Sequence, residues 1–310
     1  MGLVIGDHER AALAEAARFP LLAAITGRRS RRFPVGGRVP AGRLAYASHR
    51  PIQPLSEVER ALLLSFVAGT TGWHDGITHH PGYAPSLPNY SGSATGRTFP
   101  SAAGFHTSQL FFTDDTGTYL LPTRDQVPQP PGTVEEWVGH TADCYVRISD
   151  SRLQLPAEEP YMEGHNTWVA NHPGSLLAFP VADLAEHLLE NLWFFAANGY
   201  PVVDDINGRG IANGLPGFSR LPHADEPIPL SFVEQYTLTE ASAELSIAAH
   251  NGALALQAMG LGGWIYDGLD RLSVLGGSGD PRAPGLGFAA DHDPRWPFPN
   301  ATGLPGYFET

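Results

Sequence analysis

The sequence predicts an α+β fold, in which a central, mostly antiparallel sheet is flanked by helices. The order of the periodic segments is helix, helix, hairpin, strand, helix, helix. The chain has 310 residues, of which 42% are hydrophobic, so it can bury a sizeable core. Its 35 Gly and 28 Pro indicate long ordered loops around that core. Because no repeat or linker divides the chain, we expect residues 1–310 to form one domain.

Two helical patterns precede the first long loop. Residues 8–25 carry apolar side chains at helical spacing and are interrupted by a proline. Residues 55–70 form the second helix, with Ser56 as N-cap and Glu59 completing a capping box. Residues 71–103 are rich in Gly, Pro, Ser and His, and a loop of this length is usually functional or disordered.

The hairpin is predicted at residues 106–125, where "QLFFT" and "TYLLP" flank the turn "DDTG". Residues 133–150 follow as a short helix and then a strand centred on 145–148. Cys144 falls in that predicted strand and is expected to be a core residue. Residues 151–176 show no regular pattern.

Two more helices are predicted in the second half. Residues 181–199 form a helix that ends at Asn198-Gly199. Residues 239–263 form the longest helix, with Thr239 as N-cap. Because this segment is apolar on nearly every face, we expect it to be the buried central helix. A strand-like stretch at 264–266 and a Gly/Pro-rich tail follow.

Charge restricts the function classes. The net charge is −13, which argues against nucleic-acid and acidic-membrane partners, and no window offers the ~20 apolar residues of a membrane span. The single cysteine excludes an internal disulfide, and the N-terminus lacks a signal-peptide pattern, so we expect a soluble, cytoplasmic protein. All 19 basic residues are Arg, which excludes Schiff-base lysine chemistry and the lysine of a P-loop.

Four of those arginines are concentrated in "TGRRSRRF", at positions 28, 29, 31 and 32. A short basic run is often a solvated surface patch. Its place between a helix and a Gly/Pro loop also suits a phosphate, which guanidinium groups and the Ser30 hydroxyl would bind through charge-assisted hydrogen bonds.

Two other clusters contain residue types that occur in binding sites. "GLGGWIYDGLD" (260–270) has glycines that can cap a helix or let the backbone approach a flat ligand, but it is no dinucleotide fingerprint, because it follows a helix. "WHDGITHH" supplies His74, Asp75, His79 and His80, residue types that bind zinc or iron. Their loop context favours a solvent-exposed loop.

Three separated segments together resemble the nitroreductase superfamily of flavin enzymes. "RRSRRF" (28–33) resembles its Arg-Arg-Ser-x-Arg signature. "RTFPSAAGFHTSQLFFTDDTGTYLLP" (97–122) resembles the Pro-Ser-Ala-Gly segment and hairpin of the azoline (thiazoline/oxazoline) dehydrogenase branch. "AAHNGALALQAMGLGGWIYDGLD" (248–270) is similar to a family helix and is the most specific match. Residues 125–235 match poorly and are interpreted as a family-specific insertion or lid.

The resemblance implies a nitroreductase-like homodimer that binds FMN. The cofactor-binding residues that it implies are Arg28, Arg29, Ser30, Arg32, Pro100, Ser101, Ala102, Tyr266, Gly268 and Arg282. It implies catalytic roles for His106 and Asp267, with His106 as the candidate proton donor. Arg31 is expected to be the arginine of the cluster left to solvent. The chain departs from the azoline branch in having no lysine for its Lys-Tyr pair, in placing His106 where that branch has Tyr, and in replacing a Gln with His250.

The functional hypothesis is an FMN-dependent oxidoreductase that transfers hydride by a ping-pong scheme to a small organic, aromatic or azoline-type substrate, with NAD(P)H as a possible electron donor. One alternative is a non-catalytic protein that binds or sequesters flavin. Another is a metal-dependent hydrolase built on His74, Asp75, His79 and His80. A last alternative is a family member that no longer binds flavin.

Overall fold

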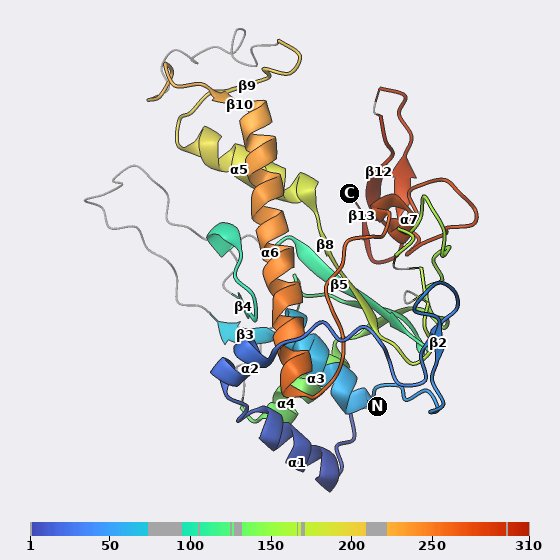
Figure 1. Ribbon diagram of the computed structural model, residues 1–310. Helices are drawn as coiled ribbons and strands as arrows, with labels where there is room; N and C mark the ends of the chain where they lie inside the picture. Colours follow the sequence, from blue (N-terminus) through green and yellow to red (C-terminus); the bar gives the residue numbers. More distant parts are fainter. Residues whose placement is uncertain are drawn as a thin grey trace.

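The computed structural model describes residues 2–73, 95–104, 106–124, 126, 132–165, 167–168, 171–208, 222–295 and 297–309. Its main sheet has four antiparallel strands in the order β7-β6-β5-β8. They are β5 (Ser108–Asp114), β6 (Gly117–Leu121), β7 (Val146–Ser149) and β8 (Leu177–Ala182). The α+β prediction, with a mostly antiparallel sheet, is confirmed (Figure 1).

The helices lie mainly on one side of this sheet, around the long helix α6 (Figure 1). Their bounds are α1 (Asp7–Ala16), α2 (Leu21–Gly27), α3 (Glu57–Ala68), α4 (Val134–Asp143), α5 (Leu184–Ala197), α6 (Leu230–Ala258) and α7 (Arg271–Leu275). Helix α6 packs against α3, α5, α2 and strand β8. The predicted capping box is present at α3, where Ser56 Oγ accepts from Glu59 N at 3.1 Å and Glu59 Oε2 accepts from Ser56 N at 2.8 Å.

Side chains of the predicted hairpin alternate between two cores. Leu110 and Phe112 of β5 pack with α3 and α6, whereas Phe111 between them points to the opposite face. On that opposite face it meets the irregular segment 153–162 and residues 274–304. Because both faces of β5 are covered and β6 and β8 flank it, the strand is buried along most of its length.

Helix α6 differs from the prediction in its start and in its burial. It begins at Leu230, with Pro229 as N-cap, and Thr239 is an interior residue whose Oγ1 donates to Gln235 O at 2.8 Å. Its buried residues form one seam with three- and four-residue spacing: Val233, Thr237, Ala241, Glu244, Ala248, Gly252 and Ala255. Apolar side chains outside the seam, such as Phe232 and Tyr236, are exposed, so the helix is buried along one face and not all round.

Strand β8 was also not expected, because no element was assigned to residues 177–180 and residues 181–182 were interpreted as the start of a helix. Pro180 lies inside it, opposite Leu110 of β5. Proline cannot donate to a ladder, but β8 is an edge strand, where the missing N–H is tolerated. Strands β7 and β8 both come from residues 125–235, so this interval supplies half of the four-stranded sheet.

The remaining strands are short. They are β1 (Arg38–Val39), β2 (Tyr46–Ala47), β3 (Thr70–Trp73), β4 (Thr95–Arg97), β9 (Val202–Val203), β10 (Ile228–Pro229), β11 (Ala289–Asp291), β12 (Asn300–Leu304) and β13 (Phe308–Glu309). Residues 264–266 belong to no helix or strand, so the strand predicted there is wrong. Cys144 is the C-cap of α4 and lies just before β7. Among the described residues, no helix is both long and apolar enough to cross a membrane.

Candidate functional site

The arginine segment follows α2 and lies against the C-terminal end of α6. Arg31 Nη1 donates to Leu261 O at 3.1 Å, and its Nη2 donates to Gln257 Oε1 at 3.2 Å. A Cβ on Gly262 would lie 3.1 Å from Arg31 O, so the two backbones approach closely there. Arg31 is exposed, but its guanidinium also makes these two contacts, which the sequence did not predict. Arg31 binds the helix end, because unpaired carbonyls and the helix dipole attract a cation there.

The other arginines of the cluster form no ion pair with a carboxylate of the described residues. Arg32 lies over the Trp264 ring, with its Cζ 5.5 Å from the ring centroid. Arg29 Nη1 donates to Thr26 O and Arg28 O, at 3.1 and 2.7 Å. Within the described residues none of the four makes an ion pair, and all four are exposed. The segment thus presents an unneutralised positive surface, as an anion site requires.

The Pro-Ser segment is attached to the same helix, further toward its middle. Asn251 Nδ2 donates to Thr98 O at 2.7 Å, two residues before Pro100. Pro100 is exposed and Ser101 half-buried, and the chain then enters a 3₁₀ turn, η1 (Ala102–Gly104), that contacts α6. The first motif (28–33) and the second (97–122) therefore both contact the third (248–270), which is the C-terminal end of α6 and the chain after it.

The chain after α6 is fixed by the segment that precedes β8. Gly268 O accepts from Glu163 N at 2.9 Å, and Asp270 N donates to Tyr161 O at 2.9 Å. Asp267, which directly precedes the first of these anchors, is exposed. Burial raises the pKa of the Tyr266 hydroxyl to about 12.

Buried polar atoms in these motifs lack a hydrogen-bond partner among the described residues, among them Ser101 Oγ, Trp264 Nε1 and Tyr266 OH. A buried group of this kind usually meets water or a ligand. Together with the unneutralised arginines, these donors fit a polar ligand that carries a phosphate, as FMN does.

His106 lies in the chain between η1 and β5. It is 8% exposed, and its ring meets Phe99 edge to face, with the centroids 6.0 Å apart. A buried imidazole beside the Pro-Ser segment remains compatible with the role expected of it.

Arg282 is engaged elsewhere. Its guanidinium pairs with Asp280 at 3.0 Å and Glu158 at 3.2 Å, and it also donates to Tyr161 OH. These contacts place it among residues 158–161 and 280–282, and two carboxylates already balance its charge. We therefore leave Arg282 out of the proposed phosphate site.

The histidine cluster at residues 74–80 lies outside the described residues. In the part of the chain that the structure describes, no group of three or more His, Cys, Asp or Glu side chains is arranged to hold a metal ion.

One group of buried polar residues was missed by the sequence reasoning. Glu244 lies in the buried seam of α6, and its Oε1 accepts from Ser108 Oγ at 2.5 Å. Nearby, His187 of α5 lies 3.0 Å from Glu240, measured from Nε2 to Oε2. The sequence did carry a signal that Glu244 is buried. Glu244 follows Ala241 by three residues and precedes Ala248 by four, so it lies on the same helix face as these buried alanines.

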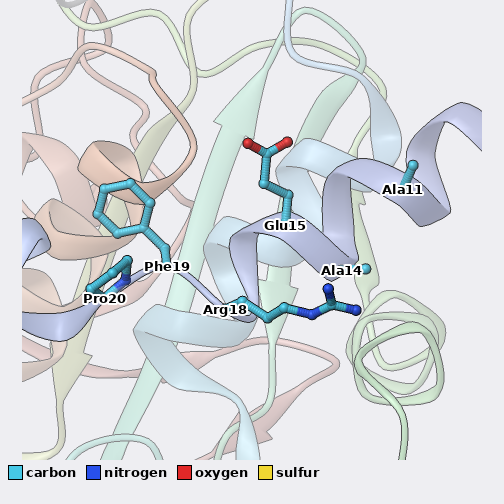
Figure 2. A pocket seen from close by; sticks show the side chains of 6 residues that line it. All are labelled: Ala11, Ala14, Glu15, Arg18, Phe19 and Pro20. Atoms are coloured by element: carbon cyan, nitrogen blue, oxygen red, sulfur yellow. The ribbon is translucent and has the colours of Figure 1, made fainter.

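An open depression of about 350 Å³ lies on α1 and the turn after it (Figure 2). Ala11, Ala14, Glu15, Arg18, Phe19 and Pro20 line it. None of the predicted site residues contributes to it. The depression therefore has no part in the candidate site.

No protein-family model matches the sequence. No curated protein matches it either. Among solved structures, the chain is similar to a crystal structure from Ralstonia eutropha JMP134 described as a "putative nitroreductase", with 16% identity and a TM-score of 0.39. The likeness covers 82% of this chain and 72% of that chain. Because both the identity and the TM-score are low, we base no assignment on it.

Proposed function

We propose that this chain is an FMN-dependent oxidoreductase of nitroreductase type that acts on a small organic substrate. The observation that carries the proposal is the convergence of three motifs, distant in sequence, around the C-terminal half of α6. Arg31 joins the first motif to Leu261 of the third, and Asn251 of the third motif joins it to Thr98 of the second. Unrelated surface features would have no reason to meet along one helix.

In this proposal the phosphate of FMN is bound by Arg28, Arg29, Ser30 and Arg32. Guanidinium forks suit phosphate oxygens, and in a chain without lysine they are the side-chain cations available. Arg31 holds the segment on α6 and so positions its neighbours. Within the described residues, no carboxylate pairs with these arginines and competes for the anion.

The second and third motifs would hold the rest of the cofactor. Ser101 Oγ and Tyr266 OH are buried groups without a hydrogen-bond partner in the described part of the chain, so they can hydrogen-bond the cofactor. Pro100, Ala102 and Gly268 offer small surfaces that let it lie close to the backbone. When bound, FMN supplies hydride transfer between a donor, NADH or NADPH, and an acceptor. The residues of this chain bind and orient it, and His106 and Asp267 are the nearby groups that can hold a proton.

We also propose that the chain forms a homodimer. Large apolar side chains are exposed on the outward faces of α5 and α6, among them Trp193, Phe232 and Tyr236. A monomer rarely leaves a contiguous apolar surface of this kind in water. A second copy that packs there would bury it.

The absorption spectrum of the purified protein tests the function. We expect flavin bands, and anaerobic bleaching of those bands by NADH or NADPH. A flavin that no donor reduces would favour the non-catalytic binding protein. A colourless protein that takes up no FMN when titrated with it would contradict the proposal.

A further inference from the structure

Helix α5 docks on α6 through polar side chains. The fully buried residues of α5 are His187 and Asn191. By contrast, Leu189 and Trp193 of the same helix are 65% and 64% exposed. The contact between these helices therefore differs from the apolar packing of α3 on α6, and polar contacts hold much of it.

The contacts themselves converge on one carboxylate. His187 Nε2 lies 3.0 Å from Glu240 Oε2, and Asn191 Nδ2 donates to the same oxygen at 3.1 Å. Asn191 Nδ2 also reaches Thr237 Oγ1 at 3.1 Å. On the other side of the imidazole, Nδ1 lies 3.3 Å from Thr107 Oγ1, just before β5.

Two further carboxyl groups at this junction each have a buried oxygen without a donor. Glu244 is 2% exposed, and its Oε2 has no hydrogen-bond partner among the described residues. Glu190 Oε2, on α5, is buried and unpartnered in the same way. An ionised carboxylate with an unpaired buried oxygen is costly, whereas a protonated one is much less so.

The surrounding charges do not offset these two groups. The acids at the junction are Asp183, Glu186 and Glu190 on α5 and its N-cap, and Glu240 and Glu244 on α6; the bases are Arg97 and Arg124, with His187 between the helices. Arg124 pairs with Glu186 at 2.5 Å. Arg97 donates to the carbonyls of Gly96 and Arg124, at 3.3 and 3.0 Å. Among the described residues at this junction, negative groups outnumber positive ones, so the junction favours bound protons.

The pKa values agree with this geometry. Burial, opposed by the Ser108 hydrogen bond and the charge of Arg97, raises the pKa of Glu244 to about 7. Burial, reinforced by the charges of Glu186 and Glu244, raises the pKa of Glu190 to about 7 as well. Both groups would change charge near neutral pH.

We propose that the α5–α6 junction is a pH-sensitive joint, in which Glu190 and Glu244 are protonated while α5 is docked on α6 and release their protons to solvent when α5 opens. Rising pH favours the open form, because the freed carboxylates are then ionised and hydrated. Falling pH favours docking. The joint is independent of the proposed flavin site.

Hydrogen exchange of the α5 amides tests the joint, with protection factors used so that the intrinsic pH dependence of exchange cancels. Between about pH 6 and about pH 8, we expect protection of 184–197 to fall about tenfold or more relative to α3. E190Q and E244Q replace each acid with a neutral amide of similar shape and should flatten this dependence. E234Q, at an exposed position of α6, is the matched control and should behave like the wild type.

Three outcomes would overturn the proposal: α5 protection that does not change with pH, a loss that α3 shares equally, or an unchanged pH dependence in both Gln variants. If E244Q fails to fold, E190Q alone decides, since Glu190 is half-buried and its removal breaks no hydrogen bond among the described residues.

Discussion

Asn251 Nδ2 donates to the carbonyl oxygen of Thr98 at 2.7 Å, across 153 positions of sequence. The bond joins the middle of α6 to the chain that leads into Pro100 and Ser101. It therefore fixes the second motif of the candidate site to the third.

Replacing Asn251 with Ala should cost about 1–2 kcal/mol of unfolding free energy, because the Thr98 carbonyl loses its donor in a partly buried place. It should also weaken flavin retention, because the Pro-Ser segment is released from α6. Urea unfolding and the flavin content of the purified variant measure the two effects. S246A is the control, because the Ser246 hydroxyl that it removes donates to Ser242 O of the same helix. Flavin content equal to wild type in N251A would show that this bond does not position the site.

The packing of α6 on α3 depends on a close approach at Gly252. A Cβ there would lie 2.8 Å from Val67 Cγ2, and β-branched Val67 has little rotamer freedom in a helix. We expect G252A to lower stability by about 1–2 kcal/mol, although Ala is the better helix former. Thermal or urea unfolding provides the measurement.

Gly139 of α4 is the matched control, because a Cβ added there meets nothing within 4 Å. G139A should raise stability by about 0.5–1 kcal/mol through helix propensity alone. If both variants were stabilised equally, the α3–α6 contact would be looser than described.

The buried carboxyl of Glu244 should make global stability depend on pH. Its pKa is raised from the ordinary 4.5 to about 7 in the folded protein, so the folded state binds the proton more tightly than the unfolded state. The stabilisation is therefore full below about pH 4.5 and is lost as the pH rises toward 7, by an amount on the order of 2–3 kcal/mol. Urea unfolding at several pH values gives the free energy of unfolding as a function of pH, and this free energy should fall less steeply with rising pH in E244Q than in the wild type. If the unfolding free energy of E244Q and of the wild type depended equally on pH, a group other than Glu244 would be responsible for that dependence.

Features set by neighbouring residues were predictable from the sequence. The α3 capping box needs only Ser56 and Glu59, and the β5–β6 hairpin needs only its alternating strands and the turn between them. Features set by tertiary contact were not. Thr239 is a good N-cap by composition, but the helix continues past it toward its N-terminus because Val233 and Thr237 are buried in the seam. Proline is disfavoured inside strands, yet Pro180 pairs with β5 at a sheet edge, where its missing N–H is tolerated.

The candidate site was predictable in part. The three motifs could be recognised in the sequence, and the structure brings them to one helix. Which arginine faces that helix depends on the position of the Leu261 carbonyl, which no local pattern encodes. The polar junction of α5 was equally hidden, because Leu189 and Trp193 would ordinarily be assigned to the buried face of that helix instead of His187 and Asn191.

The central claim is that the arginine segment binds the phosphate of FMN, and the flavin content of the R28A/R29A double variant tests it most directly. R38A/R43A removes two exposed arginines nearby and is the matched control. We predict that FMN binds R28A/R29A at least about 100-fold more weakly, since two charge-assisted hydrogen bonds are lost, and that R38A/R43A retains wild-type affinity. Equal FMN affinity in the wild type and both variants, measured by fluorescence titration of the apoprotein, would contradict the assignment.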